Sequence, residues 1–313
     1  MHAHPAGLRR AQLLRMALGI SVGAALPAGA LAQGGAATAP LQTRPIPSSQ
    51  EPMPVIGCGT WIGFDHRPGS AEYQRLAGVL KALFDAGGQM IDSSPMYGRA
   101  EETTGELLSA AKTHERAFLA TKVWTRGRAE GVAQMEQSFA RLRAARIDLM
   151  QVHNLVDWRT QLATLREWKA AGRIRYIGIT HYTASAYGDV EAVMRAQTLD
   201  FLQINYSLDQ REAEKRLLPL AAERGIAVIA NTPFGGGGLL RRLQGQPLPG
   251  WAAEIGCTSW AQVLLKFVLG QPAITCAIPG TSRPAHMADN AAAGRGTLPD
   301  AAFWRRHAAS LAV

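Results

Sequence analysis

Eight short apolar runs, separated by stretches with helical periodicity, constrain the fold of this chain more than any other feature. The runs occupy residues 55–56, 89–91, 117–120, 149–152, 176–179, 201–204, 227–229 and 275–278. Short apolar or β-branched runs are typical of buried strands, whereas apolar residues spaced as Leu76, Val79 and Leu80 are typical of helices. Eight such repeats predict a single-domain α/β fold, a closed (β/α)8 barrel, over residues 44–313.

An open, doubly wound parallel sheet is the alternative architecture for alternating strands and helices. It is disfavoured because residues 57–60, which follow the first run, lack the third glycine of a GxGxxG motif, and no helix follows directly. Several predicted helices end in a glycine that leads into a strand, at Gly87, Gly172 and Gly225. This placement fits a left-handed helix C-cap, and it supports the strand-and-helix alternation.

The first 33 residues have the layout of a signal peptide. They contain Arg9, Arg10 and Arg15 but no Asp or Glu, and an uncharged run follows over residues 16–32. The run is short for a membrane span and rich in Ala and Gly, and residues 30–32 supply the small side chains of a cleavage site. We therefore expect cleavage near Ala32 and a flexible Gly/Ala/Thr/Pro-rich tether over residues 33–43.

The Arg9-Arg10 pair resembles a twin-arginine (Tat) signal, although the usual flanking Ser and Phe are missing. An ordinary secretory signal is the alternative. Either signal predicts recognition by an export machinery and a periplasmic location for the mature protein.

The composition argues against a nucleic-acid partner. Without the three leader arginines the formal charge falls from +9 to +6, spread over isolated arginines without interleaved aromatic residues. The three cysteines, Cys58, Cys257 and Cys276, lie in apolar surroundings at wide spacing, which favours buried thiols over a metal site. Pairing of Cys257 with Cys276 stays open.

Four polar residues follow consecutive predicted strands. Asp92 and Tyr97 come after the second apolar run, Lys122 ends the third, and His153 ends the fourth. Active sites of such barrels lie at the carboxyl ends of the strands, so we expect these side chains around one mouth. Singly, Asp92 could cap a turn and His153 could be a core histidine; the set in this order is the informative feature.

This set suits the reduction of a carbonyl group, which needs a hydride for carbon and a proton for oxygen. Tyr97 would donate the proton, and Lys122 would lower its pKa by stabilising the phenolate. Asp92 would hold Lys122 in place, and His153 would orient the carbonyl oxygen.

Five motifs carry a resemblance to a known family. They are GCGTW at 57–61, IDSSPMYG at 91–98 with Glu101, TKVW at 121–124, IDLMQVH at 147–153 and GRIRYIGI at 172–179. Together they resemble the aldo-keto reductases over about residues 44–293, and Asp92, Tyr97, Lys122 and His153 match that family's catalytic tetrad. The resemblance implies a (β/α)8 fold, bound NADP and carbonyl reduction, usually without metal.

Cofactor contacts are expected where residues match the family. Gln203 resembles the residue that binds the nicotinamide carboxamide. The segment around Gly280, Thr281, Ser282 and Arg283, followed by Asn290, resembles the adenosine-phosphate site at the start of the last barrel helix, where Arg283 would suit a 2′-phosphate. A helix cap with a surface arginine is the plainer interpretation of the same residues.

Three departures from the family bear on the cofactor. The family often has Ser-Asn where this chain has Thr180-His181, and it often stacks a Tyr or Trp where this chain has Asn231. Phe234 could substitute for that ring. The run 235–238 consists of four glycines, so the amide of Gly235 and its neighbours could approach the pyrophosphate, or the run could be a mobile loop. NAD in place of NADP stays an alternative.

Trp61 and Trp124, with Phe234, are expected to wall the substrate pocket, which favours an aldehyde or ketone with an apolar or aromatic part. Two other functions are compatible with the residues. One is a Schiff-base lyase that uses Lys122 as nucleophile, and the other is a cofactor-binding sensor barrel with little turnover. A metallohydrolase is disfavoured because the histidines show neither HxH nor HExxH spacing.

Overall fold

Eight parallel strands follow one another around a barrel in the order of the sequence. The computed structural model describes residues 39–311, so the predicted signal peptide lies outside the described residues. The strands are β3 (Cys58–Gly59), β4 (Met90–Asp92), β5 (Phe118–Val123), β6 (Ile147–His153), β7 (Ile174–Thr180), β8 (Phe201–Asn205), β9 (Ala227–Asn231) and β10 (Ile274–Ala277). The Gly57 amide donates to the Ala277 carbonyl, and the Ala277 amide donates to the Val55 carbonyl, both at 2.9 Å. These bonds join the last strand to the first, and the predicted (β/α)8 barrel is confirmed.

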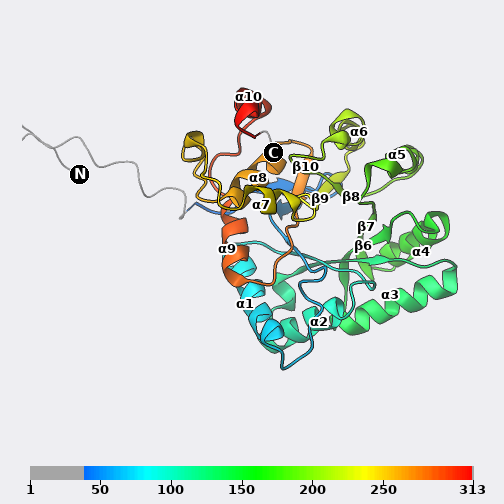
Figure 1. Cartoon of the computed structure of the whole chain (residues 1–313). Helices are drawn as coiled ribbons and strands as arrows, with labels where there is room; N and C mark the ends of the chain where they lie inside the picture. The colour runs from blue at the N-terminus through cyan, green and yellow to red at the C-terminus, as the bar shows by residue number, and fades with distance from the viewer. Residues whose placement is uncertain (1–38, 312–313) are drawn as a thin grey trace, which may run out of the picture. The chain divides into compact units, whose positions relative to one another are not determined.

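A helix follows each strand and covers the outside of the barrel (Figure 1). The helices are α1 (Ala71–Asp85), α2 (Ala100–Ala111), α3 (Arg128–Leu142), α4 (Trp158–Ala170), α5 (Tyr187–Ala196), α6 (Leu217–Glu223), α7 (Gly238–Leu243), α8 (Trp260–Leu269), α9 (Pro284–Ala292) and α10 (Ala301–Arg306). Gly172 and Gly225 follow α4 and α6 with φ of 72° and 62°. The predicted left-handed helix ends are therefore confirmed, and they turn the chain back towards the next strand.

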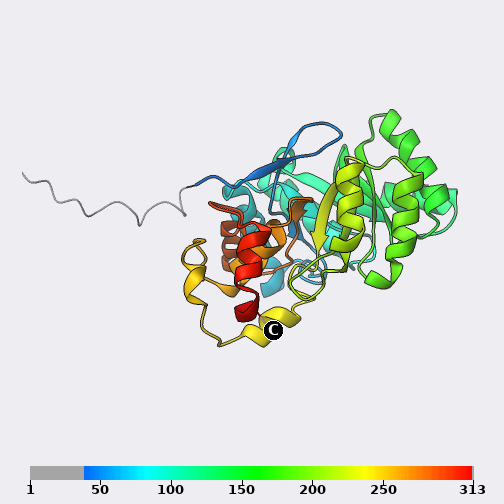
Figure 2. The same ribbon diagram turned by 90° about the horizontal axis from the view of Figure 1, so that it is seen from above.

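The amino-terminal end of the barrel is plugged by a hairpin of β1 (Thr43–Pro45) and β2 (Pro52–Pro54). Its residues Ile46 and Met53 are buried in one cluster with the inward side chains of Phe118, Leu149 and Phe201. Figure 2 shows the hairpin in blue on the opposite side of the strands from α7, in yellow. The plug leaves the carboxyl ends of the strands as the open end of the barrel.

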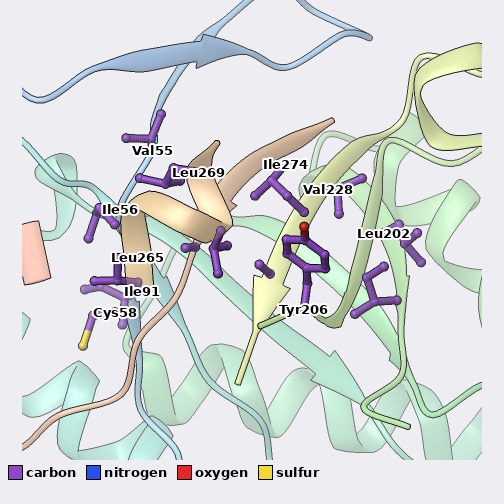
Figure 3. Packing of buried hydrophobic residues seen from close by; sticks show 14 of the residues in the cluster. Val55, Ile56, Cys58, Ile91, Leu202, Tyr206, Val228, Leu265, Leu269 and Ile274 are labelled. Atoms are coloured by element: carbon purple, nitrogen blue, oxygen red, sulfur yellow. The ribbon is translucent and has the colours of Figure 1, made fainter. Parts of the chain in front are cut away.

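A second apolar layer lies between the strands and the helices. Figure 3 shows Leu265 and Leu269 of α8 beside Val55 and Ile56, and all four side chains are buried. Both faces of the strands are thus covered by apolar side chains. This explains why the sequence of each strand is a nearly continuous apolar run.

Ordered packing begins before the boundary expected at residue 44. Leu41 is buried, and the Gln42 amide donates to the Gly294 carbonyl at 2.9 Å. The Gln42 carbonyl accepts from the Val55 amide at 3.0 Å. Residues 41–43 are therefore held against the barrel, and the expected tether cannot extend to residue 43. No pattern in the sequence indicated that Leu41 would be buried, because it is a single large apolar residue in a Gly/Ala/Thr/Pro-rich stretch.

The three cysteines are buried free thiols, as predicted, and Cys257 and Cys276 are not bridged. Burial raises the pKa of Cys58 to about 12 and that of Cys257 to about 11, so neither forms a thiolate at neutral pH. Within residues 39–311, no three His, Cys, Asp or Glu side chains gather in a way that could hold a metal ion. No helix in this part of the chain is long and apolar enough to span a bilayer.

Candidate active site

A buried ion pair lies at the carboxyl ends of β4 and β5. Lys122 Nζ donates to Asp92 Oδ2 at 2.6 Å and to the Ser93 carbonyl at 2.7 Å. Both side chains are almost fully buried. Inward positions alternate along β5, from Phe118 through Ala120 to Lys122, so the lysine extends the interior of the barrel upward. The predicted contact between Asp92 and Lys122 is present.

The second oxygen of Asp92 is held by two amides from other strands. Asp92 Oδ1 accepts from Gln203 Nε2 at 2.8 Å and from Gln151 Nε2 at 3.2 Å. Thr180 Oγ1 donates to Gln203 Oε1 at 3.3 Å. Gln151 was not singled out from the sequence, although its place two residues before His153 puts it on the same face of β6. Side chains from five consecutive strands therefore form one network.

Tyr97 lies above this network on the loop after β4, where its amide donates to the Ser94 carbonyl at 3.0 Å. Its ring centroid lies 5.1 Å from Lys122 Nζ and 6.1 Å from the centroid of His153. Burial raises the pKa of Tyr97, and this effect outweighs the opposing effect of the Lys122 charge. The expected lowering of this pKa is therefore wrong in the absence of ligand, because desolvation of the phenolate is the larger effect.

His153 ends β6 and is neutral. Burial, together with the charges of Lys122 and His181, lowers its pKa to about 3. Its Nδ1 lies 3.2 Å from Ser94 Oγ, a partner that was not predicted. The ring of Trp124 lies 6.4 Å away, centroid to centroid. A neutral imidazole fixed at one nitrogen can offer the other to a ligand.

Lys122 is held as an ammonium. Burial by itself lowers its pKa, but the negative charge of Asp92, the hydrogen bond to that carboxylate and the interaction with Tyr97 raise the pKa above the ordinary value. A lysine that forms a Schiff base must lose its proton readily. This environment therefore argues against the lyase alternative.

The residues expected near the nicotinamide gather at the ends of β7, β8 and β9. His181 Nδ1 accepts from the amides of Tyr182 at 3.1 Å and Thr183 at 3.3 Å, and burial lowers the pKa of the ring. The neutral ring therefore carries its proton on Nε2 and can donate from there. Asn231 Nδ2 donates to the His181 carbonyl at 3.2 Å, so Asn231 positions this histidine.

The Gly-rich segment after β9 forms consecutive left-handed turns. Gly235, Gly236 and Gly237 have φ of 56°, 62° and 84°. A Cβ at Gly235 would lie 2.8 Å from Asp209 Oδ1, so this position combines an unusual conformation with a close neighbour. Phe234 is packed in the main apolar core, which leaves little of its ring available for stacking.

The segment expected to bind the adenosine phosphate follows β10. The Arg283 amide donates to Thr281 Oγ1 at 3.1 Å, and Arg283 precedes α9 without capping it. The guanidinium of Arg283 is exposed, whereas Asn290 is buried within α9. Gly280 pairs with Gly59, and Ser282 is half-buried, so the segment runs along the rim of the barrel.

Exposed apolar side chains surround the same end of the barrel. Trp61 and Trp124 expose 58% and 41% of their surface. Ile62, Met96 and Tyr182 are exposed as well, and all five lie on loops that follow β3, β4, β5 or β7. Solvent-exposed aromatic surface beside a polar network is typical of a binding site for small molecules.

The barrel and this network together define an oxidoreductase of the β/α-barrel type. The chain belongs to the aldo/keto reductase family, whose family model matches residues 55–309. It is 29% identical to "Methylglyoxal reductase YeaE" of Escherichia coli K12 over 248 residues, which cover 77% of this chain and 85% of the relative.

Two solved structures share the fold. A Klebsiella pneumoniae aldo-keto reductase in complex with NADPH is 26% identical, with a TM-score of 0.72 over 85% of this chain and 93% of the other. An aldo/keto reductase of the same organism, in complex with NADP and acetate, is 25% identical, with a TM-score of 0.69 over 86% of this chain and 95% of the other.

Proposed function

We propose that this enzyme reduces an aldehyde or ketone to an alcohol with NADPH, and that Tyr97 donates the proton. The single observation that carries the proposal is the placement of Lys122, 2.6 Å from Asp92 and 5.1 Å from the centre of the Tyr97 ring. Family membership and the NADPH and NADP complexes of similar proteins support the cofactor. NADPH, when bound, supplies the hydride.

Residues of the chain supply the proton for the carbonyl oxygen and stabilise the phenolate that remains. At neutral pH Tyr97 is protonated, and its hydroxyl proton passes to the carbonyl oxygen as negative charge develops there. The ammonium of Lys122 stabilises the resulting phenolate, and Asp92 keeps that ammonium charged and in place. Gln151 and Gln203 hold the second oxygen of Asp92, so the carboxylate cannot turn away from the lysine.

His153 orients the substrate. A neutral imidazole donates a hydrogen bond to a carbonyl oxygen without competing for the proton that Tyr97 gives. Its pKa of about 3 keeps the ring neutral across the physiological range. Trp61 and Trp124 provide apolar surface for the remainder of the substrate.

The described residues also fit the cofactor. His181 has a donor on Nε2 for the carboxamide, and the exposed Arg283 at the start of α9 suits a 2′-phosphate. The amides of Gly235 and Gly237 already donate to the carbonyls of Thr232 and Phe234, so they are not available to a pyrophosphate. NAD remains the alternative dinucleotide, and Arg283 is the residue that decides between them.

Replacement of Tyr97 by Phe tests the proposal. The expected result is a loss of kcat of at least about a hundredfold with a panel of aldehydes, while the affinity for NADPH, measured by fluorescence titration, stays unchanged. Tyr182→Phe is the matched control, because Tyr182 is a tyrosine at the same mouth that stacks on His181 and does not contact Lys122. Unchanged reduction by Tyr97→Phe would remove Tyr97 from the mechanism. NADPH binding without turnover in the wild type would favour the sensor alternative.

The proposal extends to residues 1–32, which act as a twin-arginine signal peptide and direct the folded enzyme to the periplasm with its nucleotide bound. A double Arg9→Lys, Arg10→Lys variant should accumulate in the cytoplasm, as judged by cell fractionation. Periplasmic enzyme that contains no nucleotide after purification would contradict the retention of cofactor.

A further inference from the structure

Two consecutive serines after β4 connect three residues of the proposed active site. The carbonyl of Ser94 accepts from the Tyr97 amide at 3.0 Å, and its hydroxyl lies 3.2 Å from His153 Nδ1. The carbonyl of Ser93 accepts from Lys122 Nζ at 2.7 Å. The two serines therefore contact the proposed proton donor, the lysine that supports it and the histidine that orients the substrate.

The local sequence determines where Ser94 lies. The Ser93 amide donates to the Ala120 carbonyl at 2.9 Å, which holds the segment to β5. A β-turn from Ser94 to Tyr97 follows, and it is closed by the hydrogen bond between these two residues. Serine is favoured at the first position of such a turn and proline at the second, and Pro95 also restricts Ser94 to extended backbone conformations. The fully buried hydroxyl of Ser94 is therefore presented to His153 from a rigid backbone.

The hydroxyl of Ser94 is the donor in its hydrogen bond to His153. Among the described residues, His153 Nδ1 is the only hydrogen-bond partner of Ser94 Oγ. If Nδ1 carried the ring proton and donated to Ser94, the hydroxyl proton would be buried without an acceptor, which is costly. Because the imidazole is neutral and Nδ1 accepts, its single proton is on Nε2.

The second ring nitrogen of His153 is free for a ligand. Within residues 39–311, Nε2 forms no hydrogen bond, and it is not one of the buried polar atoms that lack a partner. It is therefore accessible at the open end of the barrel, where the exposed ring of Trp124 lies 6.4 Å away, centroid to centroid.

We infer that Ser94 is a positioning residue, which fixes His153 as the tautomer that carries its proton on Nε2. This inference rests on the proposed function, because the proton on Nε2 is the one that His153 donates to the carbonyl oxygen of the substrate. In the opposite tautomer, Nε2 would present a lone pair to that oxygen and would repel the negative charge that develops there. Ser94 acts through the imidazole, since its own hydroxyl is already bonded to Nδ1.

Nitrogen NMR of the free enzyme tests the tautomer. In protein that contains 15N-labelled histidine, the signals of His153 are identified by their loss in His153→Gln. Wild-type His153 is expected to show a protonated Nε2 and a non-protonated Nδ1 at neutral pH. In Ser94→Ala, the signals should shift towards those of a mixture of both tautomers, because no partner then decides which nitrogen binds the proton. A protonated Nδ1 in the wild type, or the same fixed tautomer in both proteins, would overturn the inference.

Kinetic measurements test the consequence for reduction. Ser94→Ala is expected to lower kcat by about tenfold with a panel of aldehydes, because the donor to the developing oxyanion is no longer fixed. The affinity for NADPH, measured by fluorescence titration, should stay unchanged. In a His153→Ala background, Ser94→Ala should lower kcat by less than about twofold, since a residue that acts through His153 has nothing left to position. A tenfold decrease in both backgrounds would show that Ser94 acts by another route.

Ser138→Ala is the matched control. It removes a fully buried serine hydroxyl from α3, where Ser138 Oγ donates to the Gln134 carbonyl at 3.3 Å. A decrease in kcat as large in this variant as in Ser94→Ala would contradict the inference, since the loss of any buried hydroxyl would then suffice.

The two measurements separate this inference from the proposed function. Unchanged reduction in a Ser94→Ala variant that has lost the fixed tautomer would refute the inference and leave the proposed function intact. A wild type that shows the fixed tautomer but reduces no aldehyde or ketone would refute the proposed function alone. The wild-type spectrum decides the tautomer even where Ser94→Ala does not fold.

Discussion

Lys122 Nζ lies 2.6 Å from Asp92 Oδ2 in the interior of the barrel, and neither side chain has appreciable contact with solvent. Two charges in such a place stabilise each other only as a pair, because the removal of either leaves an uncompensated ion. The pair is therefore both a structural element and the support of the proposed proton donor, and these two roles can be separated by experiment.

Single replacements of the pair should destabilise the fold strongly. Lys122→Met or Asp92→Asn is expected to lower the free energy of unfolding by about 3–5 kcal/mol, measured by denaturant titration. The double variant should recover much of this loss while remaining inactive, because it restores neutrality but not the ammonium beside Tyr97. Additive losses of stability in the double variant would show that the two charges are not coupled.

Acid should destabilise the fold through His153. The folded-state pKa of about 3 lies below the value near 6.5 expected for the unfolded chain. The stabilisation is therefore complete above about pH 6.5 and is lost as the pH falls towards 3, because the unfolded state binds the proton first. Between about pH 7 and pH 4, the free energy of unfolding should therefore decrease by up to about 3 kcal/mol less in His153→Gln than in the wild type. If the free energy of unfolding depended on pH in the same way in the wild type and in the variant, His153 would not be the cause of the acid destabilisation.

The pH profile of reduction should be flat around neutrality. His153 is already neutral, and the raised pKa of Tyr97 keeps its proton in place. We expect kcat/KM with NADPH to be constant from about pH 6 to about pH 9, because the pKa of Tyr97 lies above the ordinary range of a tyrosine. A decrease centred between pH 6 and 7 would indicate instead that an imidazole titrates in the free enzyme.

Arg283 should set the choice of cofactor. Arg283→Gln is expected to raise the KM for NADPH by about tenfold or more and to leave the KM for NADH nearly unchanged, because only NADPH carries the 2′-phosphate. Arg305→Gln, which changes another exposed arginine in α10, is the control for net charge. Equal effects on both dinucleotides would remove Arg283 from the phosphate site.

Two glycines in helices should respond in opposite ways to alanine. A Cβ at Gly105 in α2 would lie 2.1 Å from the Arg141 carbonyl oxygen, whereas a Cβ at Gly188 in α5 meets no atom within 4 Å. Gly105→Ala should cost at least about 2 kcal/mol of unfolding free energy, since backbone atoms of α3 must move. Gly188→Ala should gain about 0.5 kcal/mol from reduced freedom of the unfolded chain. Equal effects in thermal unfolding would show that the close approach of α2 and α3 is not rigid.

Periodicity in the sequence was sufficient to predict the barrel, because each βα unit obeys local rules and eight units close in only a few ways. The same reasoning located Asp92, Lys122 and His153, since a polar residue at the end of a buried strand is evident in a single chain. Gln151 was missed, because an amide inside a strand becomes informative only when a carboxylate lies opposite it. That carboxylate, Asp92, is 59 residues away in the sequence.

The tertiary structure alone decided the charges at the site. The sequence places Lys122 near Tyr97, which by itself lowers the pKa of the tyrosine, but the depth of burial raises it above the ordinary value. Similarly, the four-residue connection over residues 154–157 showed no local signal of its left-handed turns. Strand and helix follow from periodic contacts close in sequence, whereas desolvation and long-range pairing depend on which surfaces the completed barrel encloses.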